Sequence, residues 1–96
     1  MGTQNKTIII TGASRGIGRS VSMLFARLGA NLVICSRSKS ALANVSKDLD
    51  KLGANYLAIS ADVGDAKSVD NLFKAAKKKF GRIDIVVNNA GSGLRA

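Results

Sequence analysis

Apolar runs alternate with amphipathic stretches along the chain, and this alternation predicts strands separated by helices. Short apolar runs lie at residues 6–10, 31–36, 55–62 and 83–88. They lack strict polar–apolar alternation, which is typical of parallel strands buried on both faces. The stretches between them carry apolar residues three or four positions apart, as on one face of a helix. The predicted buried faces are Ile17, Val21, Leu24, Phe25 and Leu28; Leu42, Val45, Leu49 and Leu52; and Val69, Leu72, Phe73, Ala76 and Phe80.

Polar and glycine residues mark where the predicted helices begin and end. Ser38 or Ser40 can cap the second helix and Asp65 the third, because their side-chain oxygens accept from free helix N–H groups. A glycine follows each helix, at the position where a left-handed residue commonly ends one. These glycines are Gly29, Gly53 and Gly81.

The order of the elements predicts an α/β fold. Each strand is joined to the next by one helix of about a dozen residues, which implies right-handed crossovers and a parallel sheet with helices on both faces. We therefore predict a doubly wound, Rossmann-type sheet with strand order 3-2-1-4. Such a sheet binds ligands at the carboxyl ends of strands one and four. No linker, repeat or low-complexity segment interrupts residues 1–96, so we expect them to belong to one domain.

Composition narrows the chemistry available to the chain. Its 96 residues include no histidine, proline or tryptophan, which excludes histidine-ligated metals and histidine acid–base chemistry within this sequence. The single cysteine, Cys35, falls in an apolar run, so we expect core packing and no internal disulfide. The N-terminus lacks a signal-peptide pattern, and no apolar run approaches the ~20 residues of a membrane span. We expect a cytoplasmic protein without membrane contact.

The net charge of +9, from 15 Lys and Arg against 6 Asp and Glu, favours anionic partners, among them nucleic acid. The charges are spread along the chain, however, except for the lysine triplet at residues 77–79, which fits the solvated face of a helix. The aromatic residues fall mostly on predicted apolar faces, away from basic residues where bases could stack. Nucleic-acid binding is therefore the less favoured alternative. An acidic remainder missing from this sequence would also account for part of the excess.

Glycines cluster where the first predicted strand turns into the first helix, in the run T-G-A-S-R-G-I-G from Thr11 to Gly18. In this position, backbone N–H groups and the positive end of the helix dipole can meet a phosphate. We expect Gly12 to make the tight turn, Gly16 to let the backbone approach a pyrophosphate, and Gly18 to let helix and strand pack closely. Ser14 and Arg15 would add a hydroxyl and a positive charge. The alternative is a glycine-rich turn that binds no ligand.

The spacing T-G-x-x-x-G-x-G resembles that of the short-chain dehydrogenase/reductase family. Two further motifs agree: N-N-A-G at residues 88–91, and Asp62-Val63 after the third strand, where family members hold the adenine. The glycine run is closest to the 3-oxoacyl-(acyl-carrier-protein) reductase-like branch but occurs in other branches, so the substrate stays open. The resemblance implies a nicotinamide cofactor with residues 89–91 on its ribose side and Asn88 steadying the central strand. A purely structural turn role for both asparagines is the alternative.

Charge at the end of the second strand indicates which nicotinamide cofactor to expect. The residues there read Cys-Ser-Arg-Ser, without the carboxylate that would bind the adenosine ribose 2′-hydroxyl. Arg37 and Arg15 could clamp a 2′-phosphate by charge-assisted hydrogen bonds, with Ser36 and Ser38 as further donors. We therefore expect NADP(H); the alternative is that Arg37 is simply exposed at a strand end. The expected cofactor-binding residues are Thr11, Gly12, Ser14, Arg15, Gly16, Ile17, Gly18, Arg37, Asp62, Val63, Asn89, Ala90 and Gly91.

The resemblance further implies hydride transfer between nicotinamide and a carbonyl or alcohol, which needs a serine and a Tyr-x-x-x-Lys pair. The single tyrosine, Tyr56, is followed four residues later by Ser60 and lies on a predicted strand, so we expect no catalytic residue in this chain. We interpret the chain as the N-terminal, cofactor-binding part of one Rossmann-type domain, truncated after its fourth strand. In a full-length form we expect a small carbonyl substrate and a homo-oligomer.

Two consequences of this interpretation concern the chain by itself. Its fourth strand would expose an unpaired apolar edge, so we expect marginal stability and no turnover. A stand-alone, non-catalytic nucleotide-binding or regulatory module is the alternative function. A longer reading frame containing Tyr-x-x-x-Lys would distinguish the two.

Overall fold

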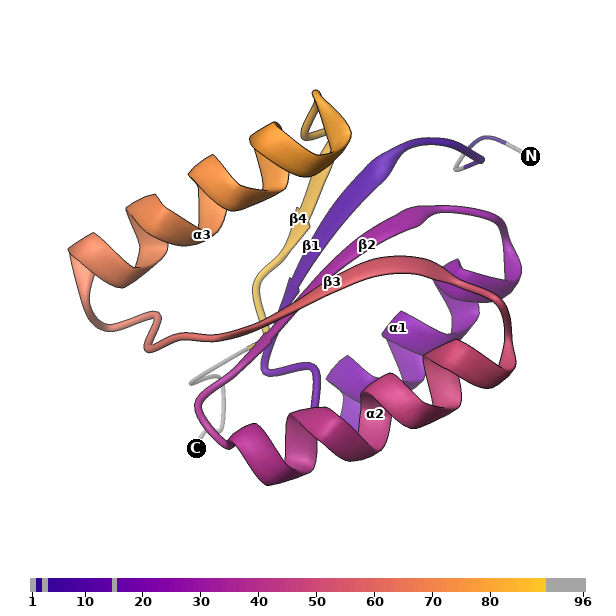
Figure 1. Cartoon of the computed structure of the whole chain (residues 1–96), viewed down its shortest axis with the longest axis horizontal. Helices are drawn as coiled ribbons and strands as arrows, with labels where there is room; N and C mark the ends of the chain where they lie inside the picture. Colours follow the sequence, from indigo (N-terminus) through magenta and orange to yellow (C-terminus); the bar gives the residue numbers. More distant parts are fainter. Residues whose placement is uncertain (1, 3, 15, 90–96) are drawn as a thin grey trace.

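The computed structural model describes residues 2, 4–14 and 16–89. Within them, parallel strands form a four-stranded sheet in the order β3-β2-β1-β4, with helices on both faces (Figure 1). The predicted doubly wound α/β fold and its strand order are confirmed. The elements are β1 (Thr7–Thr11), α1 (Gly16–Arg27), β2 (Asn31–Ser36), α2 (Lys39–Lys51), β3 (Asn55–Ser60), α3 (Ala66–Phe80) and β4 (Ile85–Val87).

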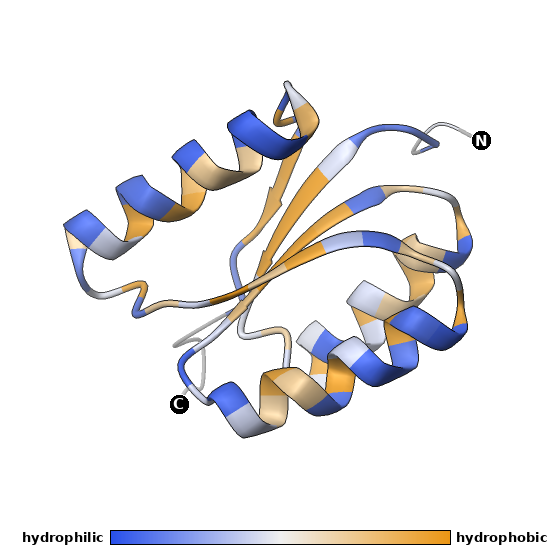
Figure 2. Ribbon diagram, viewed as in Figure 1, coloured by the Kyte–Doolittle hydropathy of each residue, from blue (hydrophilic) through white to orange (hydrophobic). Residues whose placement is uncertain are grey.

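Two apolar layers, one on each face of the sheet, hold these elements together. On one face, Ile8 and Ile10 of β1 pack with residues of α1 and α2; on the other, Ile9 packs with residues of α3. Figure 2 shows strands that are mostly apolar and helices striped with polar and apolar residues. All of β1 and all but the first residue of β2 are buried, which explains why both sequences read as continuous apolar runs.

The strand register brings the carboxyl ends of the strands to one edge of the sheet. Thr11 at the end of β1 pairs with Cys35 of β2, and Ser36 at the end of β2 pairs with Ser60 at the end of β3. β4 runs parallel to β1 on its other side. The loops that follow β1, β2 and β3 therefore leave the sheet side by side, at the edge where the site was predicted.

The helix ends follow the predicted capping pattern. Ser38 rather than Ser40 is the N-cap of α2, where its hydroxyl oxygen accepts from the Ala41 N–H at 3.2 Å. Asp65 caps α3 in the same manner. Gly81 ends α3 with a φ of 77°, a left-handed conformation that glycine adopts without steric penalty.

The buried face of α1 differs from the prediction. Ile17 and Leu24 are 73% and 52% exposed, whereas Gly18 and Ser22 are the residues of this helix that are buried. Successive helical residues are rotated by about 100°. When Gly18 and Ser22 face the sheet, Ile17 and Leu24 therefore lie on the part of α1 that is turned away from it. Leu52, predicted on the buried face of the second helix, is also exposed because it lies at the C-cap, past the last turn. The count of apolar residues missed Ser22, whereas the close packing of Gly18 was expected from the glycine run.

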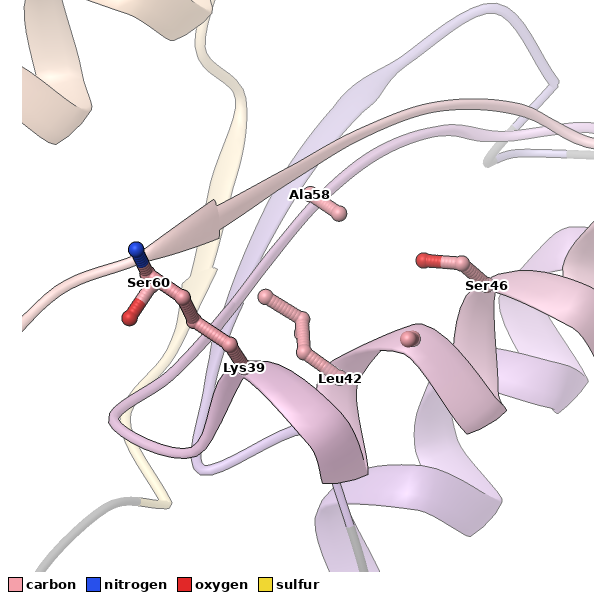
Figure 3. Close-up of a pocket in the computed structure, with 6 residues that line it drawn as sticks. Lys39, Leu42, Ser46, Ala58 and Ser60 are labelled. Atoms are coloured by element: carbon pink, nitrogen blue, oxygen red, sulfur yellow. The ribbon is translucent and has the colours of Figure 1, made fainter.

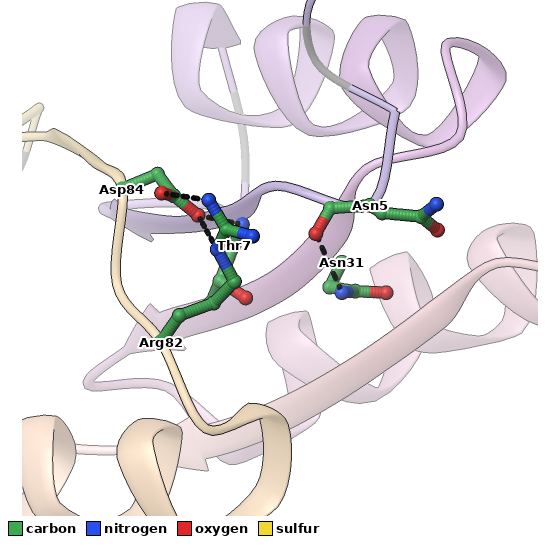
Figure 4. Close-up of polar contacts among 5 residues, drawn as sticks. All are labelled: Asn5, Thr7, Asn31, Arg82 and Asp84. Atoms are coloured by element: carbon green, nitrogen blue, oxygen red, sulfur yellow. Dashed lines mark hydrogen bonds and ion pairs between the residues drawn. The ribbon is translucent and has the colours of Figure 1, made fainter.

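β4 is shorter than the predicted run 83–88, since it begins at Ile85 and ends at Val87. Asp84, the residue before it, makes hydrogen bonds at the start of the strand. The Asp84 carboxylate accepts from two Arg82 nitrogens at 2.7 Å and from the Thr7 backbone N–H at 2.9 Å (Figure 4). These bonds, first of all those from Arg82, lower the pKa of Asp84 from 3.8 to about 2. On the same side of the sheet, Asn31 Nδ2 donates to the Asn5 carbonyl at 3.3 Å. This network lies at the amino end of the sheet, opposite the predicted site.

β2 has the predicted bounds, β1 lies one residue later than predicted, and β3 ends two residues earlier, at Ser60. As predicted, β4 is an edge strand, and Val86 on it is 46% exposed. The marginal stability expected from this apolar edge stays a prediction. Among the described helices, none is long and apolar enough to cross a membrane.

Candidate functional site

The glycine run links the end of β1 to the start of α1. Gly12 and Gly16 both have a φ of 60°, a left-handed conformation that favours glycine. A Cβ placed on Gly16 would meet no atom within 4 Å, so open space faces the backbone there. The first turn of α1 contains no acidic residue to offset the positive end of the helix dipole. The helix start can therefore receive an anion.

Gly18 is the point of closest approach between α1 and the end of β1. A Cβ on Gly18 would lie 2.1 Å from the Gly12 carbonyl oxygen and 2.8 Å from Asn89 Nδ2. No side chain fits in this space, so the close packing predicted for Gly18 is present. The Ser22 hydroxyl, one turn further along α1, donates to the Gly18 carbonyl at 2.8 Å. The close approach of Gly18 to Gly12 fixes the position of the start of α1 relative to the sheet.

β4 is tied to the glycine run through Thr11 and two asparagines. The Thr11 hydroxyl lies 3.1 Å from Asn88 Oδ1 and 3.4 Å from the Val87 carbonyl oxygen, and it accepts from the Asn89 N–H at 2.9 Å. Asn89 Nδ2 also donates to the Gly12 carbonyl at 3.2 Å. Asn88 thus contacts the inner strand β1, as predicted, and Asn89 holds the first turn of the glycine run.

The end of β2 lies directly beside the glycine run. The Ala13 N–H donates to the Cys35 carbonyl at 3.0 Å, and the Ser36 hydroxyl donates to Ser14 Oγ at 2.9 Å. Arg37, one residue further, is exposed. Within residues 2, 4–14 and 16–89 its guanidinium forms no ion pair. We had predicted from the sequence that the Ser36 hydroxyl donates to a phosphate. In the structure, it donates its hydrogen bond to Ser14.

Asp62 and Val63 follow β3, whose end is held beside β2 by a 3.1 Å bond from the Ala61 N–H to the Ser36 carbonyl. Asp62 is exposed, and its Oδ1 accepts from the Gly64 N–H at 2.9 Å. Val63 lines a cavity of about 240 Å³ beneath α3. The other lining residues of this cavity are Thr11, Val69, Leu72, Phe73, Val86 and Asn88.

A second hollow, of about 290 Å³, lies between α2 and β3 (Figure 3). Leu42 and Ala58 form its apolar part, and the hydroxyl groups of Ser46 and Ser60 belong to its polar part. Figure 3 shows Lys39 reaching from the start of α2 toward Ser60 at the end of β3. The hollow adds a positive charge to the edge of the sheet that also carries Arg37.

Two reactive side chains are held in their protonated forms. Burial raises the pKa of the Cys35 thiol, whose Sγ donates weakly to the Ala61 carbonyl at 3.7 Å. The Tyr56 hydroxyl donates to Asp50 at 2.8 Å, and partial burial, followed by that hydrogen bond, raises its pKa. Both shifts oppose the deprotonated forms that a nucleophile or a general base requires.

The structure thus gathers most of the predicted cofactor-binding residues at one edge of the sheet. Direct contacts link Thr11, Gly12, Gly18 and Asn89, and the Ser36 hydroxyl joins Ser14 to the end of β2. Three of the predicted residues, Arg15, Ala90 and Gly91, lie outside the residues that the structure describes. Sequence reasoning missed the link through Ser36, for which the only signal was a serine at the end of a predicted strand.

Comparison with known proteins agrees with the family resemblance seen in the sequence motifs. The family described as short chain dehydrogenase matches residues 6–96. An L-rhamnose 1-dehydrogenase (NAD(P)(+)) from Azotobacter vinelandii is 38% identical over 91 residues, which are 91% of this chain and 36% of that protein. The oxidoreductase UcpA from Escherichia coli K12 is 46% identical over 86 residues, which are 90% of this chain and 32% of that protein.

Solved structures agree with the sequence matches. The apo form of a glucose dehydrogenase from Caenorhabditis elegans superposes with a TM-score of 0.90 at 36% identity, covering 98% of this chain and 41% of that one. A hydroxysteroid dehydrogenase from Escherichia coli also gives a TM-score of 0.90, at 35% identity, covering 95% and 39%. The chain therefore spans about a third of the length of the curated relatives that it matches.

Proposed function

Because this chain belongs to the short-chain dehydrogenase/reductase family, we propose that it forms the NADP(H)-binding part of an oxidoreductase. The reaction would transfer hydride between the nicotinamide and a carbonyl or alcohol substrate. The glycine run at the start of α1 would receive the pyrophosphate, and Asn89, Ala90 and Gly91 would line the ribose side. Asp62 and Val63 would lie against the adenine.

The observation that carries the choice of NADP(H) is the sequence and position of the end of β2. Ser36, Arg37 and Ser38 provide no carboxylate at the point where the adenosine ribose is expected. The Ser36–Ser14 bond of 2.9 Å puts this strand end beside the glycine run, so one ligand can contact both. An exposed guanidinium without a carboxylate partner in the described chain supports binding of a 2′-phosphate.

Titration calorimetry with NADPH and NADH in parallel tests this proposal. We expect tighter binding of NADPH and loss of the preference in Arg37→Asp, because an arginine–phosphate hydrogen bond contributes about 1.5–3 kcal/mol, roughly tenfold to a hundredfold in affinity. Lys47→Asp makes the same change of charge at an exposed position in the middle of α2 and should keep the preference. Equal affinities for the two nucleotides in the unmodified chain would refute the choice of NADP(H).

We also propose that this chain alone has no turnover. The sequence contains one tyrosine, Tyr56. It lies on β3, and its hydroxyl donates a hydrogen bond to Asp50. No lysine stands four residues after it. Oxidation of NADPH by the chain in the presence of carbonyl compounds would contradict this proposal. In the whole protein, a carbonyl substrate, homo-oligomerisation and a cytoplasmic location are parts of the same proposal.

A further inference from the structure

A chain of hydroxyl and amide groups joins the loop after β2 to the glycine run. Ser36, at the end of β2, is 8% exposed. Its Oγ accepts from the Ser38 N–H at 3.2 Å and donates to Ser14 Oγ at 2.9 Å. A serine hydroxyl has one proton, so Ser36 has no further proton to give to a ligand. The group that sequence reasoning assigned to the phosphate is therefore engaged within the protein.

The consequence falls on Ser14. Its Oγ accepts the proton of Ser36, so its own hydroxyl proton remains to be donated elsewhere. Ser14 is half-buried and lies within the glycine run, two residues before α1 begins. Hydrogen bonds aligned in one direction polarise one another, so the bond from Ser36 strengthens Ser14 as a donor. An anion bound beside the glycine run would accept that proton.

The same bonds fix the backbone around Arg37. Ser36 holds the Ser38 N–H on one side, and on the other the Ser60 hydroxyl at the end of β3 donates to the Arg37 carbonyl at 3.4 Å. The loop that carries the guanidinium is thereby connected to Ser14 by way of Ser36.

We propose that Ser36 is a positioning residue that turns the Ser14 hydroxyl toward a bound pyrophosphate and couples that contact to the Arg37 loop. The proposal rests on the proposed function for the identity of the ligand. Ser36 itself touches no part of the nucleotide. It acts through Ser14 on one side and through the Ser38 backbone on the other.

A binding cycle on Ser14 and Ser36 tests this role. We expect Ser14→Ala to weaken NADPH binding roughly tenfold and Ser36→Ala to weaken it at least as much, because that change also frees the Arg37 loop. The double variant should lose no more than Ser36→Ala alone. Ser36→Thr keeps the hydroxyl and should retain most of the affinity. Thr7→Val removes another buried hydroxyl, at the opposite end of β1 from the glycine run, and should leave binding unchanged.

The coupling has a second readout that a merely structural role would not move. Ser36→Ala should lower the ratio of NADH to NADPH dissociation constants, because the Arg37 loop loses its anchor. Strictly additive losses in the double variant, or full affinity and an unchanged ratio in Ser36→Ala, would overturn the role of Ser36.

Hydrogen exchange separates this proposal from the proposed function. In the ligand-free chain, we expect the Ser38 amide proton to be protected and to lose that protection in Ser36→Ala. An unprotected Ser38 amide in the unmodified chain would overturn the role of Ser36. Failure of the unmodified chain to bind either nucleotide would instead overturn the proposed function.

Discussion

Replacing Gly18 by alanine is the sharpest test of how α1 is placed on the sheet. The added Cβ would lie 2.1 Å from the Gly12 carbonyl oxygen, roughly 1 Å inside normal carbon–oxygen contact. The obstacle is backbone, and Gly12 is itself held by the Asn89 side chain at 3.2 Å. The Gly12 carbonyl therefore cannot move out of the way as a flexible side chain would. The start of α1 must therefore move away from β1.

Two opposing contributions determine how much Gly18→Ala changes the free energy of unfolding. Overpacking costs about 1–3 kcal/mol, and a clash between backbone segments belongs at the upper end of that range. Alanine is about 1 kcal/mol more favourable than glycine inside a helix, and Gly18 has an ordinary helical conformation that alanine can adopt. The net expectation is a loss of about 2 kcal/mol in the free energy of unfolding.

Urea unfolding followed by circular dichroism measures this loss as a lower midpoint at an unchanged slope. Gly53→Ala is the matched control, because Gly53 has a φ of 67° and open space around its missing Cβ. That control should cost about 1 kcal/mol from backbone strain alone. A Gly18→Ala variant as stable as the unmodified chain, or more stable, would show that helix propensity outweighs the contact between Gly18 and Gly12.

Three further predictions concern groups away from the glycine run. Thr7→Val should raise the free energy of unfolding by about 1 kcal/mol, because Thr7 Oγ1 is buried without a hydrogen-bond partner in the described residues; a lower urea midpoint would contradict this. The folded pKa of Asp84 is about 2 against an ordinary 3.8, so its stabilisation is complete above about pH 4 and is lost as the pH falls toward 2. Asp84→Asn should flatten the stability–pH curve in that window, and an unchanged curve would exclude the Arg82 contact as its cause. Burial raises the pKa of the Cys35 thiol, so a thiol reagent at about pH 8 should label the native chain far more slowly than the urea-unfolded chain; equal rates would show that Cys35 is accessible.

Much of the fold could be predicted from local pattern and chain connectivity. The apolar runs of β1 and β2 are buried on both faces, whereas β3 and β4 at the sheet edges are only partly buried. Right-handed crossovers allow few strand orders, so 3-2-1-4 followed without any knowledge of contacts. Ser38, Asp65 and Gly81 could be predicted as caps because each acts on backbone groups a few residues away. The glycine run was recognisable because strand, loop and helix are contiguous in sequence.

The parts that could not be predicted depend on contacts across the sheet. The close packing of Gly18 was predicted from the glycine run, but Ser22 carried no signal. An apolar count placed Ile17 and Leu24 on the buried face of α1, although both are exposed. The partner of Ser36 depends on how the glycine run folds over the end of β2, a distance of 22 residues along the chain. Sequence spacing alone therefore assigned its hydroxyl to a ligand.

Binding of an adenosine 2′-phosphate at the end of β2 can be tested at that phosphate itself, by 31P NMR of NADPH mixed with the chain. A free phosphate monoester has a second pKa of about 6, and an adjacent guanidinium favours the dianion. We predict that binding shifts the 2′-phosphate resonance and lowers its pKa, and that Arg37→Ala abolishes both changes. A bound NADPH whose 2′-phosphate titrates as it does in free solution would contradict the account.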